Sequence, residues 1–304
     1  MELFTELADI SKHENIAIAL GTFDGVHAGH QQIIGQAVQL AERSSGTSVV
    51  FTFSNHPLSI IDPERCPPFI MPEEEKVEII AGMGVDILMS IPFDAKFLQL
   101  MPAEFIQLLM RNFRPAHVVV GPNYTFGFQG KGTPEILRKA GIAYHFDVQV
   151  PEAVLVEGSL VSSTLIRQLI AGGDVQQAAK LLGRPFTMDG KVINGDQRGR
   201  LLGYPTANLP IPPGMVIPAD GVYAVQIKIG TTWLNGVANV GVNPTFNGQI
   251  RRLEVFILNF NGDLYNKEVR VSFLSRLRGE IRFAGAEALK EQIIRDINDA
   301  QRFF

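Results

Sequence analysis

Short apolar runs alternate with segments of helical period up to about residue 183. Five of the runs predict β-strands: Ile16–Leu20, Ser48–Phe53, Val85–Ser90, His117–Gly121 and Tyr144–Val150. Between them, residues 30–43 carry one apolar stripe of helical spacing, and residues 72–83 open with Pro and three Glu and stop before Gly84. Alternating strands and helices favour a Rossmann-like α/β domain, a parallel sheet with helices on both faces.

From about Arg184 strand-like runs follow one another directly, at Val222–Ile229, Thr232–Val240, Leu253–Phe260 and Val269–Leu274. Asn-Gly pairs at 194–195, 235–236, 247–248 and 261–262 predict hairpin turns. The last stretch predicts a helix with Leu289, Ile293, Ile294 and Ile297 on one face and Lys290, Arg295 and Asp296 largely opposite. We therefore expect a small antiparallel β-barrel with a closing helix, and domains at 1–184 and 185–304.

Composition narrows the class of protein. The 304 residues suit two domains of ~150 residues each. The net charge of −4 disfavours a sequence-blind nucleic-acid binder, and no apolar run approaches the ~20 residues of a membrane span. The single cysteine, Cys66, excludes an intrachain disulfide and a cysteine-based zinc cluster, which fits a reducing compartment. The acidic N-terminus lacks the basic start of a signal peptide, so we expect a cytoplasmic protein.

The strongest local signal is GTFDGVHAGH, residues 21–30, between a predicted strand and a predicted helix. Glycines allow close approach to a phosphate, and a helix N-terminus favours anions. His27 and His30 could point into one crevice and stabilise a transferring phosphoryl group. The alternatives are a Gly-rich turn with two surface histidines, or a zinc site whose third ligand is not apparent nearby.

Two further segments suggest phosphate chemistry. Ser162, Ser163 and Thr164 precede an apolar helical run that contains Arg167; they are either ordinary N-cap residues or a second phosphate site. The Gly-rich stretch 190–209 is either a pair of flexible hairpin loops or a phosphate-binding loop. Within it, Thr206 and Asn208 are spaced so that a hydroxyl and an amide oxygen could reach one magnesium ion.

Glu254 is a carboxylate inside an otherwise apolar strand run. It either faces solvent on an amphipathic strand or acts as a general base toward an attacking hydroxyl.

The 21–30 and 162–167 segments resemble the nucleotidyltransferase superfamily with an H-x-G-H signature. More narrowly, they resemble the FMN adenylyltransferase half of bacterial bifunctional riboflavin kinase/FAD synthetases. This resemblance implies adenylyl transfer from ATP to FMN with release of pyrophosphate, and it places His27 and His30 at the ATP phosphates and the transition state. The nucleotide-binding residues that it implies are Gly21, Phe23, Asp24, Gly25, Asn123, Ser162, Ser163, Thr164 and Arg167.

The second half is similar to the riboflavin kinase domain, a six-stranded barrel in that family, in residues 205–208 (PTAN), 236–241, 243–246 and 263–265. The resemblance implies that Thr206 and Asn208 hold Mg–ATP and that Glu254 activates the terminal ribityl hydroxyl of riboflavin. It also implies a loop over the ATP phosphates that includes Gly190, Lys191, Gly195, Arg198 and Arg200.

The chain departs from the family pattern at Asn55, Asn123, Thr125, Phe256, Asn259 and Asn266, where proline, acidic or basic residues, histidine, aspartate and glycine are frequent. We expect a bifunctional transferase that uses Mg²⁺ and ATP, with riboflavin, FMN and FAD as substrates or products, and with neither nucleic acid nor membrane as a partner. The alternatives are an enzyme with one live site, a flavin- or nucleotide-binding regulator without catalysis, and a flavin-using oxidoreductase.

Overall fold

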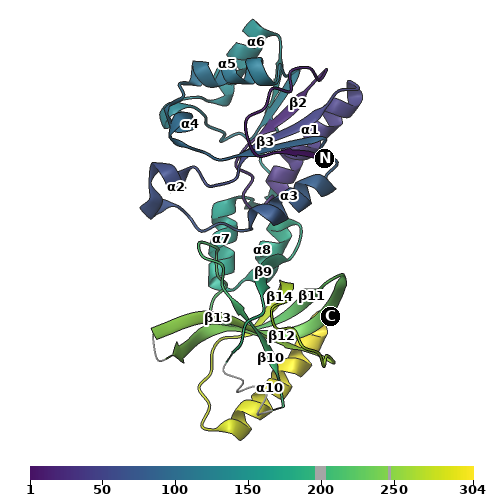
Figure 1. Ribbon diagram of the computed structural model, residues 1–304, viewed down its shortest axis with the longest axis vertical. Coiled ribbons are helices and arrows are strands. Elements are labelled where there is room, and N and C mark those ends of the chain that lie inside the picture. The colour runs from purple at the N-terminus through teal and green to yellow at the C-terminus, as the bar shows by residue number, and fades with distance from the viewer. Residues whose placement is uncertain (196–202, 246–247) are drawn as a thin grey trace. The chain divides into compact units, whose positions relative to one another are not determined.

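The computed structural model describes residues 1–195, 203–245 and 248–304 (Figure 1). The chain divides into two compact units, Met1–Ser163 and Thr164–Phe304. Among the helices of the described residues, none is both long and apolar enough to cross a membrane.

The first unit contains a six-stranded sheet in the order β1-β4-β3-β2-β5-β6, with every neighbouring pair parallel. The strands are β1 (Glu2–Phe4), β2 (Ala17–Leu20), β3 (Ser48–Phe53), β4 (Ile87–Ile91), β5 (His117–Val120) and β6 (Asp147–Gln149). The strand order reverses between β2 and β5. In open α/β sheets, ligands bind beyond the carboxyl ends of the strands at such a switch point.

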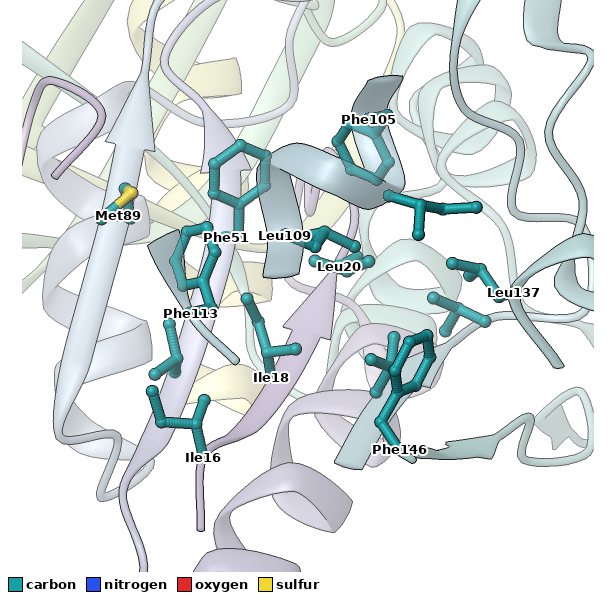
Figure 2. Close-up of a cluster of buried hydrophobic side chains, with 14 of the residues drawn as sticks. Ile16, Ile18, Leu20, Phe51, Met89, Phe105, Leu109, Phe113, Leu137 and Phe146 are labelled. Atoms are coloured by element: carbon teal, nitrogen blue, oxygen red, sulfur yellow. The ribbon is translucent and has the colours of Figure 1, made fainter. Parts of the chain in front are cut away.

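Helices cover both faces of this sheet. Ala17 and Ala19 of β2 pack toward α1 (Ala28–Arg43) and α3 (Glu73–Gly82). Ile18 and Leu20 pack toward α5 (Pro102–Asn112) and α6 (Pro134–Tyr144). Figure 2 shows how side chains from β2, β3, α5 and α6 meet in this second cluster. Burial on both faces explains why these strands are continuous apolar runs rather than alternating ones.

The remaining elements of the first unit are short: α2 (Leu58–Ile61), α4 (Ala95–Gln99), β7 (Leu155–Val156), β8 (Ser159–Leu160) and the 3-10 helices η1 (Pro63–Arg65) and η2 (Phe128–Gly130). One predicted boundary is wrong, because α6 continues through Tyr144, where a strand was expected. His145 ends the helix in the left-handed conformation, with a φ of 62°. The sixth strand begins only at Asp147.

The second unit contains an antiparallel six-stranded sheet in the order β10-β13-β12-β11-β14-β9. Its strands are β9 (Phe186–Lys191), β10 (Thr206–Pro210), β11 (Gly221–Ile229), β12 (Thr232–Thr245), β13 (Gly248–Ile257) and β14 (Glu268–Arg278). An isolated bridge between Ile193 and Asn208 brings the two ends of the sheet together, so the sheet is curled. The predicted fold class is confirmed for both halves.

Among the described residues, the second unit also contains α7 (Ser163–Gly172), which starts at the last residue of the first unit, α8 (Val175–Leu182), α10 (Ala286–Ala300) and the 3-10 helix η3 (Gln301–Phe303). α8 packs on β9 and β14, and α10 packs on β11, β12 and β14.

Two predictions in this half are wrong. Asn235 and Gly236 lie inside β12 rather than in a turn, and Gly236 is needed there because a Cβ would lie 2.8 Å from the Phe256 carbonyl oxygen. Asp296 was expected on the polar face of its helix but is only 4% exposed. Its carboxylate accepts hydrogen bonds from Arg278 Nε and Nη2, at 2.8 and 2.7 Å. Pairing with a distant strand therefore outweighs the local pattern.

Candidate functional site

The loop between β2 and α1 lies at the switch point of the parallel sheet and is closely packed. A Cβ at Gly21 would lie 2.8 Å from the ring of Phe23. Gly25 has a φ of +83°, and a Cβ there would lie 3.0 Å from Ile70 Cδ1. The glycines therefore make room for neighbouring side chains, as well as allowing a backbone conformation that other residues rarely adopt.

His27 and His30 come together at the start of α1. His27 is the N-cap residue, and its Nδ1 accepts a hydrogen bond from the His30 backbone N–H at 3.2 Å. The two imidazoles are stacked, with centroids 3.5 Å apart and an interplanar angle of 18°. Because Nδ1 is an acceptor, the neutral His27 ring carries its proton on Nε2. His27 is 6% exposed, which excludes a solvated surface histidine.

Asp24 connects this loop to two other segments. Its Oδ1 accepts a hydrogen bond from the Ile70 N–H, and its carbonyl accepts one from Ser163 Oγ, both at 3.0 Å. The serine motif of the first unit therefore contacts the H-x-G-H loop directly, beside half-buried Ser162. Thr164 and Arg167 follow on α7 in the second unit.

The loop after β5 leaves the same edge of the sheet. A Cβ at Gly121 would lie 3.3 Å from Ile33 Cδ1 of α1, so this loop begins beside the first helix. Asn123 and Thr125 are exposed, and the Tyr124 ring stacks on Phe126 with centroids 5.9 Å apart. Burial raises the pKa of the Tyr124 phenol above its ordinary value, so the phenol stays neutral. The packed rings of Tyr124 and Phe126 therefore support a loop whose polar side chains, Asn123 and Thr125, are exposed and accessible to a ligand.

Asn55, one of the departures from the family pattern, has a structural role of its own. Its Oδ1 accepts a hydrogen bond from the Phe93 N–H at 2.7 Å, and its Nδ2 donates to the Phe93 carbonyl at 3.1 Å. This reciprocal pair joins the segments that follow β3 and β4. Side-chain hydrogen bonds fix the loop where a proline ring would restrict the backbone.

In the second unit, the register brings the predicted metal ligands and the predicted base into one row. Asn208 of β10 pairs with Glu254 of β13, and Glu254 pairs in turn with Asn239 of β12. Thr206 lies two residues along β10 and therefore shares the face of Asn208. Glu254 is half-buried, whereas its strand neighbours Leu253 and Val255 are fully buried. The carboxylate thus lies on the face opposite the hydrophobic core.

The carboxamide of Asn208 is well suited to an oxygen-seeking cation. The residue is 5% exposed, and among the described residues no hydrogen-bond partner faces its Oδ1. Its Nδ2 lies 3.3 Å from the Thr206 carbonyl oxygen and 3.5 Å from the Thr206 hydroxyl. A Cβ at Gly195 would collide with this carboxamide, which explains the glycine. Within the described parts of the chain, no cluster of three or more His, Cys, Asp or Glu could hold a metal.

The predicted loop over the phosphates is wrong at its first two residues, because they pair with β14 as part of a strand. Gly190 and Lys191 end β9, and a Cβ at Gly190 would lie 3.0 Å from Leu209 Cδ2. Arg198, Arg200 and Phe246 lie outside the described residues.

Three departures in this half also have a place in the structure. Asn259 and Asn266 have φ values of 54° and 63°, a conformation that asparagine tolerates better than most residues, so Asn266 can stand in for glycine. Phe256 makes an edge-on contact with Tyr204, with centroids 5.2 Å apart.

Sequence reasoning missed two residues of these sites. Asn239 lies across from Glu254, and Thr52 Oγ1 donates a hydrogen bond to the Thr22 carbonyl of the H-x-G-H loop at 3.0 Å. The alternation around Asn239, between Ala238 and Val240, marks it as a polar residue on a half-buried strand. Thr52 carries no such signal, because threonine is an ordinary strand residue.

Comparison with known proteins agrees with the two motif sets. The FAD synthetase family model matches residues 9–165, and the riboflavin kinase model matches residues 182–304. A bifunctional riboflavin kinase/FMN adenylyltransferase from Listeria monocytogenes is 36% identical over 98% of this chain and 94% of its own. The Escherichia coli K12 relative of the same name is 35% identical over 100% of this chain and 98% of its own. A solved structure described as a macrolide-efflux protein from Streptococcus pneumoniae superposes with a TM-score of 0.88, at 34% identity over 96% of this chain and 95% of that one.

Proposed function

Since the chain belongs to the family of bifunctional riboflavin kinase/FMN adenylyltransferases, we propose that its two motif sets are the two active sites. The protein is a transferase that phosphorylates riboflavin to FMN and adenylylates FMN to FAD, with ATP as co-substrate in both steps. We assign adenylyl transfer to residues 1–184 and phosphorylation to residues 185–304. The start of the riboflavin kinase match at residue 182 and of β9 at Phe186 supports this boundary.

The stacked histidines carry the adenylyltransferase assignment. A phosphate oxygen of FMN attacks the α-phosphorus of ATP, a P–O bond forms, and the bond to the departing pyrophosphate breaks. His27 and His30 stabilise the charge that develops on the transferring group, from a helix N-terminus whose dipole favours anions. His27 acts as a hydrogen-bond donor through Nε2, because its Nδ1 is occupied by the helix cap.

The remaining residues of this site hold the nucleotide. Gly21, Asp24 and Gly25 shape the loop, and Phe23 can contact ATP only through its main chain, because its side chain is 0% exposed. We assign binding of the phosphates to polar side chains from two segments, Asn123 and the group Ser162, Ser163, Thr164 and Arg167. The hydrogen bond from Ser163 to Asp24 supports a joint role for the two motifs.

The cross-strand row carries the kinase assignment. Glu254 takes the proton from the terminal ribityl hydroxyl of riboflavin while that oxygen attacks the γ-phosphorus of ATP. A P–O bond to the ribityl oxygen forms, and the bond from the γ-phosphorus to the departing ADP breaks. Its half-buried position on the face of Asn208 allows contact with both substrates. We assign contact with the ATP phosphates to the segment that runs from the end of β9 onward, which contains Gly190, Lys191, Gly195, Arg198 and Arg200. No covalent enzyme intermediate is needed, so positioning and charge neutralisation supply most of the catalysis.

Thr206 and Asn208 are the residues that would hold Mg²⁺ at the kinase site. The buried Asn208 Oδ1 without a partner among the described residues, beside a threonine hydroxyl, fits a hard cation that prefers oxygen ligands. When bound, the ion neutralises phosphate charge.

Asn208→Ala should raise the Mg²⁺ concentration needed for half-maximal FMN formation by about tenfold or more, because one oxygen ligand is lost. Asn208→Asp keeps an oxygen at this position, so the Mg²⁺ concentration that it needs should be closer to that of the wild type. The measurement is a Mg²⁺ titration of riboflavin phosphorylation, with adenylylation of supplied FMN as the control in the same preparation. An unchanged Mg²⁺ requirement in the alanine variant would show that Asn208 is not a ligand.

The experiment that tests the proposed function uses the wild-type protein. Incubated with riboflavin, ATP and Mg²⁺ and resolved by chromatography over time, it should form FMN first and FAD afterwards. FMN without FAD would mean that only the kinase site is active. If FAD forms from supplied FMN but no FMN forms from riboflavin, only the adenylyltransferase site is active. Formation of neither product would contradict the enzyme assignment. Purification with stoichiometric bound FAD would favour a flavin-using oxidoreductase.

We further propose that the protein works in the cytoplasm on small molecules alone. The single cysteine, Cys66, supports a reducing compartment, and the net charge of −4 supports the absence of a nucleic-acid partner.

A further inference from the structure

Phe23 is held in a costly conformation at the centre of the H-x-G-H loop. Its φ is +48°, in the left-handed region that bulky side chains rarely adopt, and its side chain is fully buried. The ring lies so close to Gly21 that a Cβ there would come within 2.8 Å of it. A side chain with no exposed surface cannot recognise a substrate, so its effect must pass through the residues that it touches.

Phe23 is in contact with His30, to which we assign a role in the reaction. The two rings meet edge to face, with centroids 5.3 Å apart and an interplanar angle of 88°. The His30 imidazole is thus in contact with Phe23 and with the stacked ring of His27. The last torsion of a histidine side chain is broad, so packing against its neighbours helps to fix the orientation of the imidazole.

Thr52 forms a hydrogen bond to the peptide group that joins Thr22 to Phe23. Its side chain is 0% exposed, and its Oγ1 donates to the Thr22 carbonyl at 3.0 Å. Thr52 lies on β3, which pairs with β2 in parallel, so the donor comes from a rigid neighbouring strand. This hydrogen bond opposes rotation of the Thr22–Phe23 peptide toward the less strained conformation that Phe23 would otherwise prefer.

We propose that Phe23 and Thr52 are positioning residues of adenylyl transfer, which together hold the His30 imidazole in register with that of His27. This inference rests on the proposed role of His30. Catalytic groups must be held within about 0.5 Å and 10–20° of the productive geometry. A leucine at position 23 keeps the apolar character of the site but lacks the flat ring, so it leaves the imidazole free to turn.

A double-mutant cycle with His30 tests the proposal. Phe23→Leu should lower kcat for FAD formation from FMN about tenfold and leave the KM for ATP within about twofold, because a misplaced catalytic group affects the reaction more than binding. In a His30→Ala background the same substitution should cost less than about twofold, because there is no imidazole left to position. Riboflavin phosphorylation, measured in the same samples, should be unchanged in all four proteins.

Phe51→Leu is the matched control. Phe51 is equally deep in the first unit, at 2% exposed, and its ring contacts are with other phenylalanines. Its effect on FAD formation should be the same with and without His30. Thr52→Val removes the hydroxyl that donates to the Thr22 carbonyl and leaves every aromatic ring in place. It therefore tests the proposal even if Phe23→Leu does not fold. It should behave as Phe23→Leu does, while Thr52→Ser keeps the hydroxyl and should keep the rate.

The outcomes separate this inference from the proposed function. If His30→Ala keeps the wild-type rate, the assigned role of His30 fails, and the positioning role fails with it. If His30→Ala is slow and Phe23→Leu costs the same factor in both backgrounds, or costs nothing, only the positioning role is overturned. If turnover by His30→Ala is undetectable, the His30 imidazole resonances decide by NMR. They should shift in Thr52→Val, which removes no aromatic ring, but not in Phe51→Leu, and unchanged resonances in Thr52→Val would overturn the proposal.

Discussion

Replacing Glu254 with Gln should lower FMN formation by about 10²–10⁴-fold, the typical contribution of a general base, and leave conversion of supplied FMN to FAD unchanged. Glutamine has almost the same size as glutamate and can still form hydrogen bonds, but it cannot accept the proton of the ribityl hydroxyl. The strand register places residue 254 between Asn208 and Asn239, so the substitution changes one chemical group within an intact row. The measurement is the initial rate of each half-reaction, followed by chromatography.

The kinetic pattern distinguishes a base from a binding group. Loss of a base lowers kcat and leaves the KM values for riboflavin and ATP within a few-fold, whereas loss of a binding group raises KM. Glu287→Gln is the matched control, because Glu287 is an exposed carboxylate in the first turn of α10 in the same unit and should have no effect. An unchanged rate of phosphorylation in Glu254→Gln would reject the assignment.

Local patterns were sufficient to predict most of the fold. The buried strands β2, β3 and β5 fall within predicted apolar runs, because a strand covered by helices on both faces must be apolar throughout. Two of the failures have distant causes. Asp296 is buried because Arg278, on another element, pairs with it, and Gly236 is a strand residue because a neighbouring carbonyl approaches it closely. Neither partner can be identified from the residues next to it in the chain.

The same distinction applies to the sites. His27 and His30 could be read from the sequence, because a helix start and a spacing of three residues bring their rings together. Thr206 and Asn208 share a face by the two-residue period of a strand. The row that joins Asn208 to Glu254 and Asn239 depends on register between strands far apart in the chain, which hydrophobic periodicity does not encode. Asn239 was therefore found only in the structure.

Replacing His30 with Ala should stop the two-step conversion of riboflavin at FMN, because the second step, adenylylation to FAD, becomes slow. Removal of one preorganised group that stabilises transition-state charge typically costs about 10²–10³-fold in kcat. His30 stacks on His27 at the start of α1, where charge on the transferring group would be stabilised, so we expect a loss in this range. Starting from riboflavin, FMN should form at the wild-type rate and accumulate, because its conversion to FAD is slow.

The ratio of the two products identifies the cause of any loss. Because we assign riboflavin phosphorylation to residues 206, 208 and 254, in the other compact unit, it reports on how much protein has an intact second unit. His13→Ala is the control, since His13 lies in the segment before β2 and outside the H-x-G-H loop. FAD formation at the wild-type rate by His30→Ala would refute the role of His30. An equal fall in both products would instead indicate loss of folded protein, because a defect in charge stabilisation at one site leaves the other reaction untouched.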